Sequence, residues 1–381
     1  MSPLLDLFSD VPDPRINRTK RHELVDILVI AVLGIICGAD TWVDIEVFGR
    51  AKEPWLSRFL RLENGIPSHD TFGRVFARLD PDALSQRFLL WLRHIAGLIE
   101  PQHIAIDGKT VNGAKSGGQR RSKIHLVNAW ACKSRLVLGQ VLTEQKTNEI
   151  TAIPELLRLL DLNGCVVTLD ALGTQKAIAA QIIEQGGDYV LPLKGNHPYF
   201  HQFIRDTFEQ LDEHQLPHDF AQQEDAAHDR DERRCLWTLD LKEVDGVWRA
   251  EVHEEAVQWE GLQSLFCLES ERQVLGEPPE FRRRYYLCSF HPSAAEALGF
   301  VRGHWGIENR LHWCLDVAFD EDRSRVRSGH APQNLALLRK MALNLLRQHP
   351  SKGSIKSKRL KAGWNNDYLR SLITYADGPA P

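Results

Sequence analysis

Two aspartates follow short apolar segments that are typical of buried strands. Asp107 comes directly after His103–Ile106, and Asp170 comes directly after Cys165–Leu169. Such segments predict strands that end in an acid, and ligands of open α/β sheets bind at that edge. Two carboxylates on neighbouring strands repel each other unless a cation lies between them, and Mg²⁺ prefers carboxylate oxygens. The pair therefore predicts a magnesium site, although a turn aspartate closing each strand is the alternative for either residue alone.

A third acid, Glu308, lies in a helical segment between His304 and His312. Residues four apart share one face of an α-helix, and a glutamate in an apolar helix is costly to bury without a purpose. A polar network within the core is one alternative. A zinc site of His304, His312 and Cys314 is another, but histidines eight residues apart lie about 12 Å apart along a helix. The spacing therefore favours magnesium over zinc.

The elements that must position these acids change character along the chain. Residues 1–95 predict a helical domain in which Ser68 caps a helix after Pro67. A short helix, a turn marked by proline and a second helix could read DNA, but helical packing explains the same pattern. Three strands and then alternating helices and strands predict a mixed α/β sheet over residues 101–195.

The second half of the chain is predicted to contain an insertion, the helices that complete the α/β core, and a tail. Residues 196–290 predict a β-rich insertion, residues 291–347 closing helices that start at a capping box on Ser293, and residues 348–381 a basic tail. Strand-like patterns in the insertion cover Cys235–Leu241, Trp248–Val257, Leu265–Ser270 and Arg284–Ser289.

Composition narrows the class of protein. The net charge of −4 argues weakly against a protein that coats nucleic acid, but local clusters matter more than the sum. Eight Lys and Arg and no acid lie between Arg339 and Lys361, with further basic clusters at Arg282–Arg284 and Arg323–Arg327. Seven cysteines without a C-x₂-C pair indicate reduced core residues, hence a cytoplasmic protein. The longest apolar run, Ile27–Ala39, is too short to span a membrane.

Several segments taken in order resemble one family over roughly residues 8–350. The segments are Ser68–Phe72, Ala105–Thr110, Lys146–Pro154, Thr168–Gln175, Gly187–Asn196, His304–Asn309, Leu311–Asp322 and Gly329–Leu338. Together they resemble the bacterial insertion-sequence transposases of the ISAs-one group, also called H-repeat-associated proteins. The resemblance implies a ribonuclease-H-like core, a mixed sheet with flanking helices, an inserted β-rich segment and a helical N-terminal domain.

The resemblance also implies a catalytic and metal-binding triad of two aspartates and a glutamate at Asp107, Asp170 and Glu308. Many relatives carry a Tyr, Arg, Glu and Lys signature around the last acid, whereas this chain has Val301, His304 and Leu315 at the other three positions. We expect phosphate contacts with DNA from other residues instead: Lys109, Lys194, Arg302, His304, Asn309, Arg310 and His312. The basic run from Arg339 is expected to add to these contacts.

The implied reaction is two-metal phosphoryl transfer on DNA. Asp107 would bridge two Mg²⁺ ions, for which Mn²⁺ substitutes, while Asp170 and Glu308 hold one each. Cleavage at terminal inverted repeats frees a 3′-hydroxyl that attacks target DNA, with a homodimer on paired ends in the bacterial cytoplasm and nucleoid. Trp305 or Trp259 is a candidate for stacking on an unpaired base. The alternatives are a DNA-binding remnant without catalysis and a ribonuclease-H-like nuclease without strand transfer.

Overall fold

The computed structural model describes residues 3–95, 101–115, 123–143, 149–211, 215–227, 230–244, 250–274 and 277–374. The chain divides into two compact units, and each is described by itself. Unit 1 comprises residues 1–100, 108–148 and 308–381, and unit 2 comprises residues 101–107 and 149–307. None of the helices in the described ranges has the length and apolar character needed to cross a membrane.

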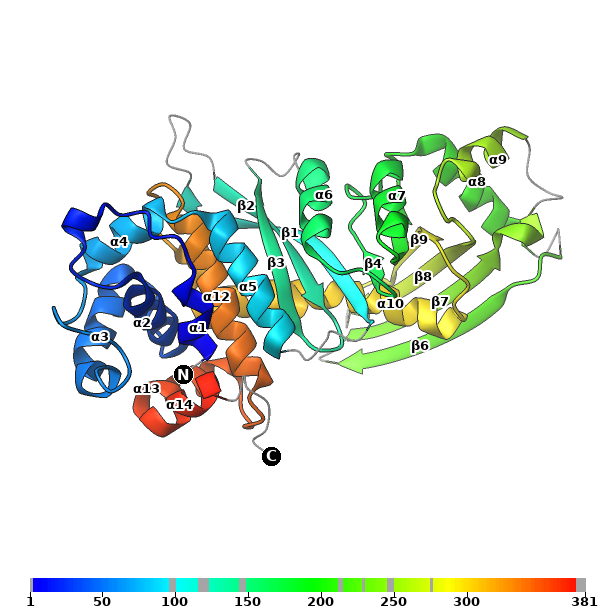
Figure 1. The fold of residues 1–381 in the computed structure, drawn as a ribbon. Coiled ribbons are helices and arrows are strands. Elements are labelled where there is room, and N and C mark those ends of the chain that lie inside the picture. Colours follow the sequence, from blue (N-terminus) through cyan, green and yellow to red (C-terminus); the bar gives the residue numbers. More distant parts are fainter. Residues whose placement is uncertain are drawn as a thin grey trace. The chain divides into compact units, whose positions relative to one another are not determined.

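Unit 1 is mainly helical. Its helices are α1 (Pro3–Ser9), η1 (Asn17–Thr19), α2 (Leu24–Ile36), α3 (Trp42–Leu56), α4 (His69–Arg78), α5 (Pro81–Ile95), α11 (Trp313–Phe319), η5 (Glu321–Arg323), α12 (Ala331–Gln348), α13 (Ile355–Trp364) and α14 (Asn366–Thr374). Helix α12, drawn in orange, lies beside α2 and α5 (Figure 1). Every α12 residue from Ala331 to Leu346 is buried. This helix is therefore the centre of the unit.

Three buried polar residues of α12, Asn334, Lys340 and Asn344, donate hydrogen bonds to other parts of unit 1. The Asn344 amide accepts from the Val137 backbone N–H at 3.0 Å and donates to the Val137 carbonyl at 2.9 Å. Asn334 donates to the carbonyls of Phe76 and Leu79, both at 2.9 Å. The Lys340 ammonium donates to the side-chain oxygen of Gln140. Buried polar groups are tolerated when hydrogen-bonded, so these contacts tie α12 to the N-terminal helices and to the sheet.

The burial of α12 corrects one expectation. Arg339, Lys340, Lys358 and Arg359 belong to the basic run that was expected to bind phosphates, yet none is more than 7% exposed. The Arg359 guanidinium donates to the Ile35 carbonyl at 2.9 Å and to Asp40 at 3.1 Å. These four cations stabilise the helical unit from inside and present no charge to DNA. The segment after His349, expected as a tail, also forms helices α13 and α14.

The strands form a mixed sheet. They are β1 (His103–Lys115), β2 (Lys123–Ala131), β3 (Leu136–Thr143), β4 (Val166–Thr168), β5 (Asp188–Leu193), β6 (Asp219–Ala227), β7 (Arg230–Asp240), β8 (Ser264–Val274) and β9 (Glu280–Cys288). Their hydrogen-bonding order is β3-β2-β1-β4-β5-β9-β8-β7-β6. Strand β4 pairs in parallel with both β1 and β5. The pairs β5–β9, β9–β8, β8–β7 and β7–β6 are antiparallel. The first residues of β1 belong to unit 2 and the remainder to unit 1.

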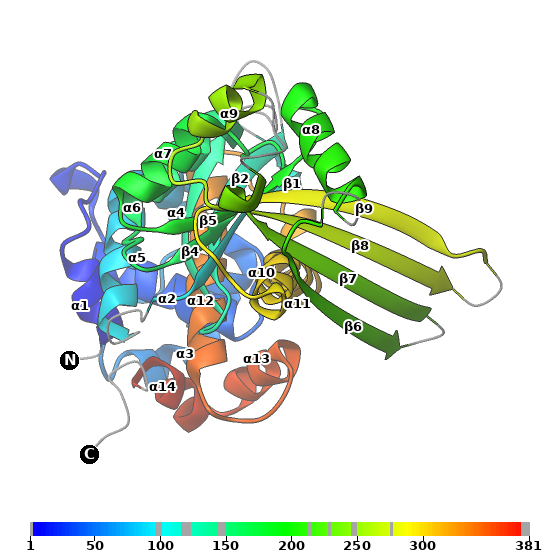
Figure 2. The ribbon, with the colours of Figure 1, turned by 90° about the vertical axis from the view of Figure 1, so that its right-hand side faces the viewer.

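Unit 2 covers its strands with helices. These are α6 (Glu149–Leu159), α7 (Lys176–Glu184), α8 (Pro198–Glu209), η3 (Leu241–Val244), α9 (Ala250–Val257) and α10 (Ala294–Gly306). Figure 2 shows β6 to β9 as four long neighbouring strands. Tyr286 packs with Val301 of α10, while the ring of Tyr285 lies 6.0 Å from that of Phe208 in α8. Since successive strand residues point to opposite faces, α8 and α10 cover opposite faces of this part of the sheet.

The insertion is the part where the sequence predicted least. Segments around β7, β8 and β9 were expected as strands, and the structure confirms them. The prediction of a strand over Trp248–Val257 is wrong, because residues Ala250–Val257 form helix α9. Strand β6 was not predicted because its sequence, DFAQQEDAA, is polar on both faces. A strand with so few apolar residues gives no periodic signal.

Candidate active site

Asp107 lies on β1, and Asp170 lies two residues after the end of β4, the strand that pairs in parallel with β1 in unit 2. The register pairs Ala105 with Thr168, and each aspartate lies two residues beyond its paired residue. Residues two apart on a strand point to the same face, and neighbouring strands lie about 5 Å apart. The parallel pairing therefore brings the Asp107 segment of β1 next to the end of β4, and Asp170 follows in the loop. Asp107 lies inside β1 rather than at its end, because β1 continues to Lys115.

The loop after β4 fixes the direction of Asp170. Its Oδ1 accepts from the backbone N–H of Gly173 at 3.0 Å. The Thr174 hydroxyl, which is buried, lies 3.3 Å from the Asp170 carbonyl and 2.8 Å from the Pro192 carbonyl of β5. A Cβ on Gly173 would come within 2.9 Å of Cδ1 of Ile153, so a larger residue there would require the Ile153 side chain to shift. This loop is therefore held closely against its own unit.

A line of three side chains runs beside Asp170. The Thr168 hydroxyl lies 2.7 Å from Nε2 of His103 and 3.0 Å from Nδ1 of His304 on α10. Burial lowers the pKa of His103 to about 3 and that of His304 to about 4, the latter against the upward pull of the Asp170 carboxylate. Both rings are therefore neutral near pH 7. Gly303 leaves the space that the His103 ring fills, since a Cβ there would lie 2.5 Å from its Nδ1.

Glu308 lies in a π-helical turn, η4 (Ile307–His312), between α10 and α11. Its side chain is exposed, as are those of Asn309 and Arg310. The expectation that residues 304, 308 and 312 share one helix face assumed α-helical geometry and is wrong across this turn. A π-helical turn closes over i→i+5 instead of i→i+4, which changes the direction of each side chain after it. Such turns recur at functional sites.

The three acids are not in one unit. Asp107 and Asp170 belong to unit 2, and Glu308 is the first residue of the last segment of unit 1. Within the described residues, no group of three or more His, Cys, Asp or Glu side chains is arranged to hold a metal ion. Asp107 and Asp170 thus share one unit and belong to segments that lie next to each other, and their role as a metal site stays a prediction.

The residues expected to contact DNA differ in their surroundings. In unit 2, Lys194 is exposed after β5, and Arg302 is 41% exposed with an ion pair to Asp225 at 3.1 Å. In unit 1, Nε2 of His312 lies 3.5 Å from the amide nitrogen of Asn128. Lys109 is 7% exposed and its ammonium contacts carboxylates of the protein, of which Asp316 is nearest at 2.6 Å.

The two tryptophans proposed for base stacking are also unlike each other. Trp259 is 1% exposed and its ring packs against His197 and Phe200, so stacking on DNA is wrong for this residue. Trp305 is 44% exposed, with the guanidinium of Arg284 4.9 Å from its ring centre. Stacking by Trp305 stays a prediction.

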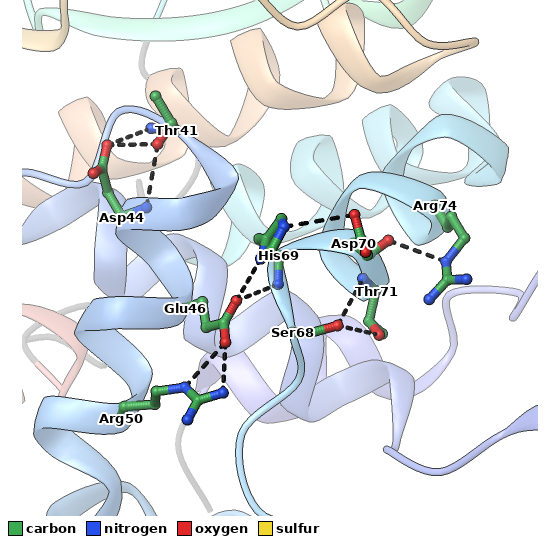
Figure 3. Close-up of polar contacts among 9 residues, drawn as sticks. All are labelled: Thr41, Asp44, Glu46, Arg50, Ser68, His69, Asp70, Thr71 and Arg74. Carbon is green, nitrogen blue, oxygen red and sulfur yellow. Dashed lines mark hydrogen bonds and ion pairs between the residues drawn. The ribbon is translucent and has the colours of Figure 1, made fainter.

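The helix pair α3 and α4 in unit 1 carries a second polar cluster, drawn in Figure 3. Ser68 caps α4 by accepting from the Thr71 N–H, as its sequence predicted. Glu46 of α3 accepts from the backbone N–H and from Nδ1 of His69, both at 2.7 Å, and from Arg50 at 2.6 Å (Figure 3). These hydrogen bonds hold the pKa of Glu46 down at about 2. The contacts dock the start of α4 on α3, and the DNA-reading role of this pair stays a prediction.

Sequence reasoning missed two groups of residues near the acids. Thr168 gave no signal, because a threonine inside a β-branched strand is ordinary. Lys109 is surrounded by Asp316, Glu321 and Asp322. These three acids entered the sequence analysis only within a segment that carries the family resemblance and were assigned no role there. Their partner lies some two hundred residues away, and no spacing rule links residues across that distance.

Comparisons with known proteins agree on one family. Residues 99–345 match the model described as "Transposase DDE domain", and residues 5–92 match the model described as "DDE_Tnp_1-associated". "Putative transposase YncI" of Escherichia coli O157:H7 is 39% identical over 97% of this chain and 94% of its own. "H repeat-associated putative transposase YhhI" of Escherichia coli K12 is 35% identical over 97% of each.

Among solved structures, a piggyBac transposase synaptic complex with hairpin DNA aligns with a TM-score of 0.42 and 9% identity, covering 99% of this chain and 78% of that one. That likeness is too low to carry an argument. The sequence matches span the chain almost from end to end and include the segments that hold the candidate acids. They show that the chain belongs to the DDE transposase family, among the insertion-sequence transposases of the H-repeat-associated group.

Proposed function

We propose that this transposase cleaves DNA at the terminal inverted repeats of its element and joins the freed 3′ ends to target DNA. Asp107, Asp170 and Glu308 would be the catalytic acids that hold two Mg²⁺ ions, with Mn²⁺ as a substitute. The observation that carries the proposal is the parallel pairing of β1 with β4, which brings the segment that holds Asp107 next to the segment that leads into Asp170.

The donor set fits a hard divalent cation. Two carboxylates on neighbouring segments repel each other, and a cation between them removes that repulsion. Mg²⁺ takes carboxylate oxygens and keeps several waters, so two aspartates and one glutamate suffice for its protein ligands. When bound, Mg²⁺ would lower the pKa of a coordinated water and neutralise charge on the phosphodiester.

The protein's own contribution would be positioning. Asp170 is held by the Gly173 N–H, which leaves its Oδ2 to face a ligand. A hydrogen bond between His304 and Thr168 anchors the end of α10 to β4. Thr168 lies two residues before Asp170, and His304 lies four residues before Glu308. We propose that the π-helical turn directs the exposed Glu308 carboxylate to the same metal site. Phosphoryl transfer needs little covalent help from protein, so such positioning would supply most of the catalysis.

Exposed residues near the acids along the chain would bind the DNA backbone. Lys194, Arg302, Asn309 and Arg310 have exposed side chains, and His304 and His312 would contribute as hydrogen-bonding rings. Lys109 is left out of this set because its ammonium is held by carboxylates inside unit 1. We propose two copies of the chain on paired ends, acting at the nucleoid in the cytoplasm. We also propose that the sheet around β1, β4 and β5 has the ribonuclease-H-like arrangement.

Cleavage of a defined substrate tests the proposal. The protein is mixed with a labelled duplex that carries the element's terminal repeat, with Mg²⁺ or Mn²⁺, and nicks at the repeat end are mapped. Asp107→Asn, Asp170→Asn and Glu308→Gln should each abolish cleavage and keep DNA binding in a mobility-shift assay. Asp206→Asn, an exposed aspartate of α8 in unit 2, is the matched control and should cleave normally.

Undiminished cleavage by one of the three variants would remove that residue from the site. A strand-transfer assay with supercoiled target DNA separates the alternatives. Cutting without joining would favour a nuclease, and binding without cutting would favour a remnant that has lost catalysis.

A further inference from the structure

The ammonium of Lys109 is enclosed by three carboxylates of one later segment. Its Nζ lies 2.6 Å from Asp316, 3.1 Å from Asp322 and 3.3 Å from Glu321, all within unit 1. Lys109 is 7% exposed and Glu321 is fully buried. Such a buried cation is tolerated only where charges of opposite sign compensate it.

The carboxylates depend on Lys109 as much as Lys109 depends on them. Neither side-chain oxygen of Glu321 has a hydrogen-bond partner in the described part of the chain, so its ion pair with Lys109 is its nearest compensation. Without the ammonium, three carboxylates would face one another in a poorly solvated place. Lys109 is therefore the cation that the three carboxylates of the segment from Asp316 to Asp322 share, and Arg339 and Lys340 add to the charge compensation of Glu321.

Backbone contacts extend the same junction along β1. The Asn112 side chain donates to Asp322 at 2.8 Å, and its backbone N–H also points to Asp322 at 3.3 Å. Gly113 lies so close to the later segment that a Cβ would come within 2.5 Å of the Ser324 carbonyl oxygen. Strand β1 and the segment after α11 are therefore in close contact at Asn112 and Gly113 as well as at Lys109.

Both sides of the junction lie next to candidate catalytic acids in the sequence. Lys109 is two residues after Asp107 on the same strand and points to the same face of the sheet. Asp316 is eight residues after Glu308, and η4 continues into α11 without a break. Residues that hold a reacting group matter because a displacement of about 1 Å can lower a rate on the order of 100-fold.

We propose that Lys109 is a positioning residue, whose ion pairs with Asp316, Glu321 and Asp322 set strand β1 and the helix after Glu308 in the register that metal binding requires. This inference rests on the proposed function, because the register matters only if Asp107 and Glu308 share a metal site. It assigns to Lys109 a contact inside the protein in place of a contact with DNA.

Two mild variants test the junction without removing the buried cation. Asp316→Asn removes one ion pair from a half-buried position, and Lys109→Arg keeps the charge but replaces a compact ammonium with a planar group. Asp320→Asn is the matched control, because Asp320 lies in the same segment, contacts Arg323 and has a left-handed backbone that asparagine also adopts. The measurements are thermal unfolding, Mn²⁺ binding by calorimetry, and the dependence of cleavage rate on Mg²⁺.

Asp316→Asn and Lys109→Arg should stay folded and bind terminal-repeat DNA. Each should bind Mn²⁺ more weakly and cleave on the order of 10-fold to 100-fold more slowly, with partial recovery at high Mg²⁺. If Asp316→Asn does not fold, Lys109→Arg carries the test. Folded variants with unchanged Mn²⁺ affinity and unchanged Mg²⁺ dependence would overturn this inference alone. A wild-type protein that neither binds Mn²⁺ nor cleaves would overturn the proposed function, and this inference with it.

Discussion

The hydroxyl of Thr168 shows how one unremarkable side chain supports the candidate site. It lies between two neutral imidazoles, one on β1 and one on α10, and it precedes Asp170 by two residues. Since His103 and His304 are neutral near pH 7, each ring has one donor and one acceptor nitrogen to satisfy. The threonine therefore fixes how the end of α10 meets β4.

Thr168→Val should lower the free energy of unfolding by about 1–3 kcal/mol, because it leaves buried ring nitrogens without a partner while keeping the shape of the side chain. Urea unfolding at pH 7 measures this loss. Thr168→Ser keeps the hydroxyl and should retain most of the hydrogen-bonding contribution. Equal stability of the valine variant and the wild-type protein would show that the two hydrogen bonds contribute nothing net.

Among the elements, those with strong periodic patterns were predictable and the others were not. Helices α2, α6, α7 and α12 have apolar faces or start and stop signals, and they lie, to within one residue, inside the regions predicted to hold helices, residues 1–95, 101–195 and 291–347. Strand β6 and helix α13 were missed because polar residues dominate their sequences, whereas α14 has an apolar face of Tyr368, Leu369, Leu372 and Ile373 that was not used in the prediction. The π-helical turn at Glu308 was also missed, since no residue type marks such a turn.

In the candidate site too, residues with a local sequence signal were predicted and residues that depend on long-range contacts were not. The two aspartates were predicted because an acid after an apolar strand is a local signal, and the structure confirms that the strands before them, β1 and β4, pair side by side. The partners of Lys109 and of Thr168 were not found, because a contact between distant segments leaves no spacing in the sequence. Charge was the least reliable guide, since Arg339 and Lys340 lie inside the helical unit.

The docking of α4 on α3 depends on one carboxylate and gives a pH-dependent prediction. Hydrogen bonds from His69 and Arg50 hold the pKa of Glu46 at about 2, below its usual value of 4.5. A carboxyl whose folded pKa is depressed stabilises the fold fully above the unfolded pKa, and that contribution is lost as pH falls from about 4.5 to about 2.

Glu46→Gln should therefore lower the free energy of unfolding at pH 7 by about 1–2 kcal/mol, and the difference from wild type should shrink as pH falls below about 4.5. Urea unfolding at pH 7, 4.5 and 3.5 measures the trend. Glu63→Gln, an exposed glutamate in the loop before α4, should show no such trend. A constant difference across these pH values would contradict the assigned role of Glu46.

At the scale of the whole molecule, the charge balance limits how DNA is bound. The chain carries a net charge of −4, and four cations of its most basic run are buried. A protein of this balance attracts DNA weakly at long range, so binding must depend on a few exposed cations that contact phosphates directly. Lys194 in unit 2 and Arg310 in unit 1 are the exposed candidates that no ion pair occupies in the described part of the chain.

Lys194→Gln and Arg310→Gln should each weaken binding to terminal-repeat DNA and to unrelated DNA alike. Each should also reduce the slope of log Kd against log salt concentration by about 1, because one fewer phosphate counterion is released on binding. Fluorescence anisotropy between low and physiological salt measures the slope. Arg205→Gln, a half-exposed cation of α8 already paired with Asp206, should leave it unchanged. If both candidate variants keep the wild-type slope, the phosphate contacts must come from other cations, and Lys194 and Arg310 would be removed from the proposed DNA-binding residues.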